Sequence, residues 1–253
     1  MKVLVGSQAL VQHFRDFYRP VKDVDYFSDT PIEGAETFYH PKLEKWEWHN
    51  NIASIDELYT IKVSHSFWNL KNNSWNKHMR DIQFLQEKNA QFIPELYELL
   101  YSIWEEKYGK KKANLEQEPD KFFNPKVDRK YEHDSVHASI AYFDEPLFNA
   151  ILRDGHAVAV DKKKFDNMPL DMKYMLVEEE VYATALERHL IPKDYAGSYV
   201  NAYKTALRQT ITSFSKGWFP LFIVLHWKEL NMPRINFVKI HKENIDQLIP
   251  LSK

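Results

Sequence analysis

The sequence predicts an α+β protein, in which an N-terminal mixed β-sheet with helices is followed by a mainly α-helical C-terminal domain. Short strand-like runs occur before residue 50, and apolar residues recur at helical spacing after it. Aromatic residues make up 15% of the 253 residues, with only 6 glycines and no cysteine. This composition is typical of helix-rich cores that are packed by aromatic rings.

The composition also limits the class of protein. Hydrophobic residues at 44% and charged residues at 28% are ordinary for a globular chain. No basic leader and no run of about 18 to 20 apolar residues is present, so we expect an intracellular, cytoplasmic protein without a membrane partner. The formal net charge of −2 gives no general attraction to nucleic acid. Lys107 and residues 110–112 form a basic run, which we interpret as a solvated loop rather than a binding patch.

The first elements are expected to form a strand, a tight turn and a helix. Residues 2–5 are a short apolar run that ends at Gly6-Ser7, after which apolar residues recur at helical spacing as far as Phe17. Pro20 ends this helix, and residues 21–27 read as a half-buried strand.

Three acidic residues are expected on neighbouring strands. Asp23 and Asp25 stand two residues apart, so both carboxylates leave the same face of the strand over residues 21–27. Residues 37–39 and 45–49 are predicted as further strands, and Glu47 lies in the second of them between two tryptophans.

Helices are predicted for the rest of the N-terminal half and for most of the C-terminal half. Ser54 is expected to cap a helix with Glu57 as its capping-box partner, and further helices cover about residues 76–88 and 92–107. Residues 109–130 lack apolar periodicity and read as a linker or surface loop between domains at residues 1–108 and 131–253. In the second domain, helices are expected near 131–143, 145–153, 170–190, 197–215 and 242–249.

The acids and the Gly-Ser turn together predict a site for cations and phosphate. Two Mg²⁺ ions bind oxygen ligands, and Asp23, Asp25 and Glu47 would supply them; Glu44 and Asp56 compete for the third place. A glycine at a strand-to-helix turn allows close approach of phosphate to the helix N-terminus. Gly6 and Ser7 would therefore hold the phosphates of a nucleotide.

Two motifs carry a resemblance to a known superfamily. Gly6-Ser7-Gln8-Ala9-Leu10 followed by Lys22-Asp23-Val24-Asp25-Tyr26 resembles the polymerase-β-like nucleotidyltransferases. The spacing is similar to that of CCA-adding enzymes and of the toxins of abortive-infection toxin–antitoxin pairs. Lys62, then Lys77-His78-Met79-Arg80-Asp81-Ile82, is similar to the helical elements of those toxins.

The resemblance implies a function and further site residues. It implies Mg²⁺-dependent transfer of a nucleoside monophosphate from a nucleoside triphosphate, such as ATP, to an acceptor. In such a site Lys62 and Lys77 would approach the phosphates, and Asp81 would help to organise the site. The acceptor is not identified, and tRNA or another nucleic acid, a protein and a small molecule all stay open. The small two-part layout would suit a phage or mobile-element accessory protein.

A second group of residues lies in the C-terminal half. His133 and His137 stand four residues apart on one helical face, and Glu179 is the acid in an apolar stripe over residues 170–190. They predict either a metal or acid–base site or a hydrogen-bonded core network. His133-Asp134 weakly resembles metal-dependent phosphohydrolases of the His-Asp type, so a hydrolase is one alternative function. A catalytically inactive binding protein is the other.

Overall fold

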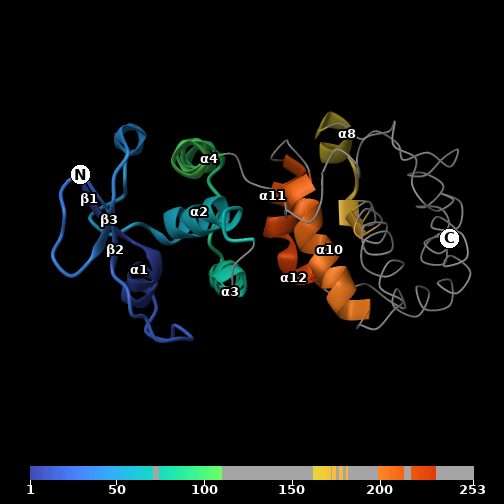
Figure 1. The fold of residues 1–253 in the computed structure, drawn as a ribbon, viewed down its shortest axis with the longest axis horizontal. Coiled ribbons are helices and arrows are strands. Elements are labelled where there is room, and N and C mark those ends of the chain that lie inside the picture. Colours follow the sequence, from blue (N-terminus) through green and yellow to red (C-terminus); the bar gives the residue numbers. More distant parts are fainter. Residues whose placement is uncertain are drawn as a thin grey trace, which may run out of the picture. The chain divides into compact units, whose positions relative to one another are not determined.

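The computed structural model describes residues 1–70, 74–109, 162–171, 173–174, 177–178, 181, 199–213 and 218–231 (Figure 1). The chain divides into two compact units, Met1–Lys112 and Ala113–Lys253. The first unit contains a small mixed sheet with a helix and then further helices, and the described part of the second unit is helical. The predicted α+β class is therefore confirmed.

The sheet has three strands in the order β1-β2-β3. β1 (Lys2–Val5) is antiparallel to β2 (Asp25–Ser28), and β2 is parallel to β3 (Glu36–Phe38). On the other side of β1, the Leu4 backbone N–H donates to the Asn51 carbonyl oxygen at 2.8 Å. β1 thus has neighbours on both edges. Val3, Leu4 and Val5 are all buried, so both faces of the strand are covered, which explains why its apolar residues form a continuous run instead of alternating.

The strands agree in part with the sequence prediction. The strand over residues 2–5 is confirmed, and that predicted at residues 37–39 is confirmed with a shift of one residue. The second strand begins at Asp25, so Asp23 lies outside it. The helix after the Gly-Ser turn was expected to reach Phe17 but is shorter: α1 (Gly6–His13) ends before Phe14.

The strand expected at residues 45–49 is wrong. Residues Pro41–Lys45 instead form a short 3₁₀ helix, η1, and no strand follows within the described residues 46–50. The cause is tertiary: the Glu57 carboxylate accepts hydrogen bonds from the Trp46 indole N–H at 2.9 Å and the His49 backbone N–H at 3.2 Å. These contacts bend the segment toward the start of the next helix.

Three longer helices complete the first unit: α2 (Ile55–Ser66), α3 (Ser74–Glu87) and α4 (Pro94–Tyr108). All three were expected from apolar spacing and are confirmed. The predicted capping box also forms, because the Glu57 backbone N–H donates to Ser54 Oγ at 3.2 Å and the Ser54 N–H donates to Glu57 Oε2 at 2.6 Å.

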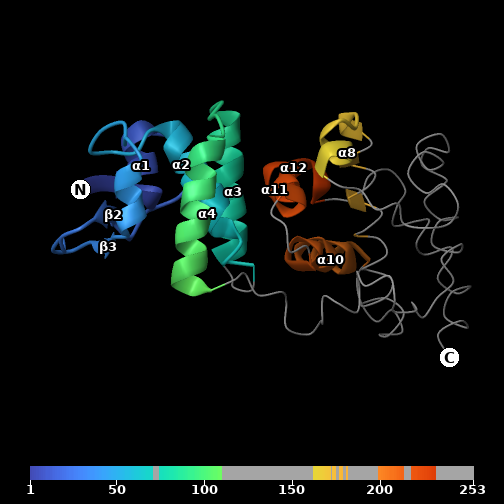
Figure 2. The ribbon, with the colours of Figure 1, turned by 90° about the horizontal axis from the view of Figure 1, so that it is seen from above.

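Helix α2 is enclosed by protein. It packs against α1, α3 and α4; Figure 1 shows it between α3 and α4, and Figure 2 shows these helices from above. Every residue from 57 to 64 is buried, including polar ones. Their hydrogen-bonding groups are paired inside the unit: Ser64 Oγ accepts from the Trp104 indole N–H at 3.0 Å, and Thr60 Oγ1 accepts from the Ile93 N–H at 3.1 Å. Helix α2 therefore places its polar side chains in the interior.

The second unit contains α8 (Lys162–Asp166), α10 (Tyr199–Ser213), α11 (Trp218–Leu225) and α12 (Trp227–Leu230). Helix α10 confirms the helix expected at residues 197–215. The Tyr203 hydroxyl donates to the Leu230 carbonyl oxygen at 2.9 Å, and the Phe165 ring packs edge-on to Phe219 at 5.6 Å. The helices expected at residues 131–143, 145–153 and 242–249 lie outside the described residues.

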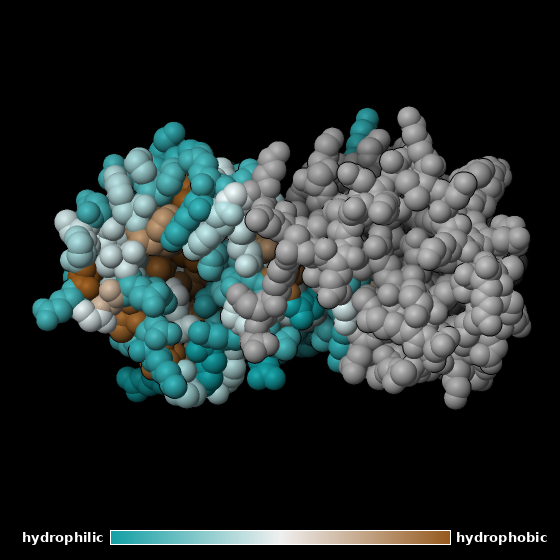
Figure 3. Space-filling view, in the orientation of Figure 1, coloured by the Kyte–Doolittle hydropathy of each residue, from teal (hydrophilic) through white to brown (hydrophobic). Residues whose placement is uncertain are grey.

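The surface of the first unit is mostly hydrophilic in the view of Figure 3, where a hollow exposes apolar residues at its base. In the described part of the chain, no helix combines the length and the apolar character needed to cross a bilayer.

Candidate functional site

The Gly6-Ser7 turn joins β1 directly to α1. Gly6 has a φ of 67°, in the left-handed region that favours glycine. A Cβ atom at this position would lie 2.1 Å from Asp25 Oδ2, so only a glycine allows the carboxylate to come this close. Within the described first unit, Val5 makes no side-chain cap and the first turn of α1 holds no acidic residue. The turn therefore brings an acid to the beginning of a helix.

Asp25 lies between acidic and basic groups. Burial raises the pKa of its carboxyl group, Glu36 and Asp23 raise it further, and the ammonium groups of Lys62 and Lys77 lower it. Glu36 is the β3 partner of Asp25 in the parallel register. Of the residues predicted from the sequence, Asp23, Lys62 and Lys77 thus lie close enough to Asp25 for their charges to shift its pKa.

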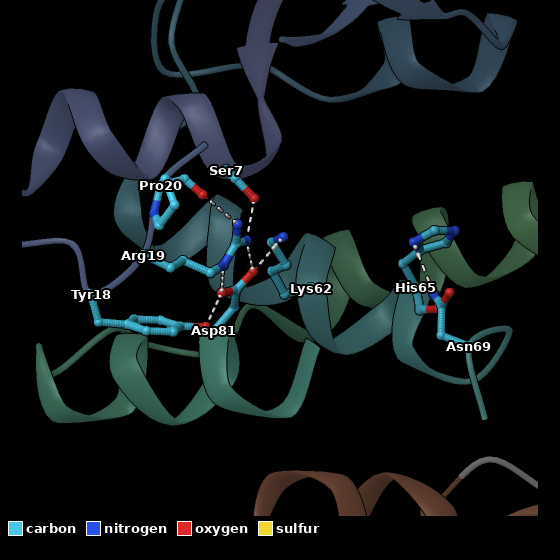
Figure 4. A network of polar contacts seen from close by, with 8 residues as sticks. All are labelled: Ser7, Tyr18, Arg19, Pro20, Lys62, His65, Asn69 and Asp81. Carbon is cyan, nitrogen blue, oxygen red and sulfur yellow. Dashed lines mark hydrogen bonds and ion pairs between the residues drawn. The ribbon is translucent and has the colours of Figure 1, made fainter. Parts of the chain in front are cut away.

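A second carboxylate, Asp81 on α3, is surrounded by hydrogen-bond donors (Figure 4). It is fully buried and accepts from the Tyr18 hydroxyl at 2.6 Å, from Arg19 Nε at 3.1 Å and from Arg19 Nη2 at 2.9 Å. Lys62 Nζ lies 2.8 Å from its Oδ2. Burial alone would raise the pKa of Asp81, but Lys62, Arg19 and Tyr18 outweigh it and lower this pKa to about 2.

The Asp81 cluster, which consists of Asp81, Tyr18, Arg19 and Lys62, connects to the Gly-Ser turn. Arg19 Nη2 donates to Ser7 Oγ at 2.5 Å, as Figure 4 shows. The side chains come from the start of α1, from the segment after it, from α2 and from α3. One network therefore links the turn with two of the helices that pack around it.

The two predicted lysines differ in their surroundings. Lys62 is 7% exposed on the enclosed helix α2, whereas Lys77 is exposed on α3. Lys62 forms an ion pair with Asp81, whereas Lys77 faces solvent.

The third acidic residue stays a proposal. Glu47 is exposed in the segment after η1. Its two competitors have other partners, because Glu44 accepts from the Tyr39 hydroxyl and Asp56 accepts from the Gln91 N–H, both at 2.8 Å. Among the described residues, no group of three or more His, Cys, Asp or Glu side chains is arranged to hold a metal ion. Glu36, which sequence reasoning did not select, is the described acid that the sheet places beside Asp25.

Arg19 and Tyr18 were also missed from the sequence. They stand before Pro20, where the sequence pattern indicates only the end of a helix. Their role depends on Asp81, 62 residues after Arg19, so no local spacing reveals it.

Two histidines, His65 and His78, lie close enough to Lys62 for its charge to lower their pKa values. The ring centroids of His65 and His78 are 5.5 Å apart. Burial, Lys62 and Lys107 lower the pKa of His65 to about 4, and burial with Lys62 lowers the pKa of His78 well below its usual value. Both rings are therefore neutral at pH 7.

The second predicted group cannot be placed in this structure. His133, His137 and Glu179 lie outside the described residues, as do residues 110–112 of the basic run.

The fold and the clustered residues define an α+β protein with acidic and basic side chains gathered at a glycine turn. The chain belongs to the family described as Domain of unknown function (DUF7275), whose model matches residues 57–246. The matched span includes Lys62, Lys77 and Asp81 and begins after the Gly-Ser turn, Asp23, Asp25 and Glu47. No curated protein and no solved structure matches the chain.

Proposed function

We propose that this protein is a Mg²⁺-dependent nucleotidyltransferase that moves a nucleoside monophosphate from a nucleoside triphosphate to an acceptor and releases pyrophosphate. The observation that carries the proposal is the contact between Asp25 and Gly6. A carboxylate lies where a side chain of residue 6 would otherwise be, at the first residue of α1. A cation held by this carboxylate would be adjacent to a helix N-terminus that attracts phosphate.

The acidic residues fit the requirements of Mg²⁺. This ion prefers oxygen ligands, keeps several waters, and is often held by one or two carboxylates together with substrate phosphates. Asp25 and Asp23 supply two carboxylates, and Glu36 and Glu47 are the candidates for a third. When bound, Mg²⁺ would activate the attacking oxygen and neutralise charge on the triphosphate.

The basic residues fit the triphosphate. The ammonium groups of Lys77 and Lys62 both lower the pKa of Asp25, so both lie near its carboxyl group. Because Lys77 is exposed, its ammonium group is available to a phosphate near Asp25. Lys62 and Arg19 together carry two positive charges against the single charge of Asp81. Asp81 itself is fully buried, which supports a role in holding these cations rather than in touching the nucleotide.

Three classes of acceptor fit this reaction. A nucleic acid such as tRNA, a protein side chain and a small metabolite each offer an attacking oxygen or nitrogen. The overall charge of −2 gives no general attraction to nucleic acid, so an RNA acceptor would need a local binding surface.

The test is a transfer assay with the full chain. Wild type and the Asp23→Asn/Asp25→Asn double variant are incubated with each α-labelled nucleoside triphosphate, Mg²⁺, and pools of tRNA, protein and metabolites. We expect label to enter one pool with wild type only. Asp16→Asn is the matched control, because Asp16 is an exposed acid that pairs with Lys88 at 2.8 Å. Equal labelling by wild type and the double variant, or none by either, would reject the assignment.

A further inference from the structure

Arg19 is held rigidly by the protein. Two of its nitrogen atoms bind the two oxygens of Asp81, in the bidentate geometry that suits a guanidinium group. The carboxylate is in turn fixed by Tyr18 and Lys62. Arg19 keeps 18% of its side-chain surface exposed, so the fixed group still borders solvent.

The bond from Arg19 to Ser7 determines what the serine hydroxyl can do. A guanidinium group only donates hydrogen bonds, so Ser7 Oγ must be the acceptor at 2.5 Å. A hydroxyl that accepts in this way still has its own hydrogen to donate. Among the described residues no second partner of Ser7 Oγ is found. As far as the described residues go, the hydroxyl hydrogen is thus available for an acceptor from outside this part of the chain.

The charges near Ser7 favour an anionic acceptor. Arg19, Lys62 and Asp81 together leave one positive charge in excess, and the proposed Mg²⁺ would neutralise the Asp25 carboxylate beside Gly6. Ser7 stands in the first turn of α1, where the helix dipole adds to this positive potential. Phosphate oxygens are the anionic acceptors that arginine-supported donors bind well.

We propose that Arg19 is a positioning residue: it fixes the Ser7 hydroxyl as a donor to a phosphate oxygen of the nucleoside triphosphate. The inference rests on the proposed function and adds the residue that orients its phosphate-binding serine. Arg19 acts through Ser7, so the two residues form one unit. Loss of either one should remove the same interaction.

The experiment measures binding by calorimetry with the full chain, Mg²⁺, and ATP, AMP or inorganic triphosphate. The proteins are wild type, Ser7→Ala, Arg19→Gln, Arg19→Lys and the Ser7→Ala/Arg19→Gln double variant. We expect each single variant except Arg19→Lys to weaken ATP and triphosphate binding by about tenfold, the usual effect of losing a charge-supported hydrogen bond. The double variant should bind no more weakly than Arg19→Gln, and Arg19→Lys should recover part of the affinity.

Two further variants separate this role from a loss of folding. Arg15→Gln removes an exposed arginine of the same segment and should leave binding unchanged. Tyr18→Phe removes a bond to Asp81 but none to Ser7, so its effect should add to that of Ser7→Ala.

The outcomes are distinct. If wild type binds neither ATP nor triphosphate, the proposed function fails and this inference fails with it. If wild type binds both and the effects of Ser7→Ala and Arg19→Gln simply add, or Arg19→Gln binds like wild type, the positioning role is rejected and the proposed function stands. Non-additive loss with partial rescue by lysine supports it.

Discussion

Replacing Asp81 by asparagine tests the Asp81 cluster directly. Asp81 is fully buried and is the shared partner of Arg19, Lys62 and Tyr18. Asparagine keeps the shape but removes the negative charge, and its amide N–H₂ cannot accept from Arg19 or Lys62, which only donate. Two buried or half-buried cations would then lack their counter-charge.

The magnitude can be worked out in two ways. Lowering the pKa of Asp81 from 3.8 to about 2 corresponds to roughly 2 kcal/mol of stabilisation at pH 7. Removing one partner of a buried ion pair typically costs about 3 to 5 kcal/mol, because the remaining charge stays buried. The first figure compares only the charged and neutral carboxyl, so we expect a loss of about 3 kcal/mol for Asp81→Asn.

The assay is urea unfolding followed by tryptophan fluorescence. Five of the seven tryptophans lie in the first unit, Met1–Lys112, so the signal reports mainly on that unit. Asp16→Asn, which breaks an exposed ion pair, is the control and should change the free energy of unfolding little.

The pH dependence gives a second, independent check. Because the folded-state pKa of Asp81 is depressed, its contribution is fully present above the unfolded value of 3.8 and is lost as pH falls toward about 2. Roughly half of the contribution should be gone at pH 3. The difference between wild type and Asp81→Asn should therefore shrink between pH 5 and pH 3. A loss below about 1 kcal/mol at pH 7, or a difference independent of pH, would refute the reasoning.

Three other predictions concern the same unit. Gly6→Ala should destabilise the protein more than Gly34→Ala, since both have positive φ but only the Gly6 Cβ would meet Asp25; urea midpoints of the two variants decide this, and equal losses would contradict the contact. Ser64→Ala should cost about 1 to 3 kcal/mol in the same assay by leaving the buried Trp104 N–H without an acceptor. Ser66→Ala, whose hydroxyl donates to the Val63 carbonyl oxygen, should cost less. His65 has a folded-state pKa of about 4, below its unfolded value of 6.5, so its neutral form stabilises the protein above pH 6.5 and this contribution, up to about 3 kcal/mol, is lost as pH falls toward 4. His65→Gln should flatten the stability profile between pH 7 and pH 4, and an unchanged slope would show that His65 titrates normally.

Local signals were sufficient for the helices of the first unit. The capping box at Ser54 and Glu57 needs only residues three apart, and the apolar spacing of α3 and α4 is set within each helix. The Gly6-Ser7 turn was equally readable, because positive φ at a strand-to-helix junction favours glycine.

The remaining features depend on residues distant in the sequence. Trp46-Glu47-Trp48 alternates as a strand would, but Glu57 binds Trp46 and His49 and bends the segment. Arg19 acquires its place from Asp81, and Glu36 acquires its place from the parallel pairing with Asp25. No periodicity in the sequence encodes which distant side chain will meet which.

The enclosure of α2 has a practical consequence for Lys62. Its amine is paired with Asp81 inside a helix that has no solvent face between residues 57 and 64, whereas the amine of Lys77 is exposed. An amine-reactive reagent should label Lys77 at once and Lys62 only when the helices separate. The labelling rate of Lys62, measured by peptide mass spectrometry, would thus report on the spontaneous opening of the unit.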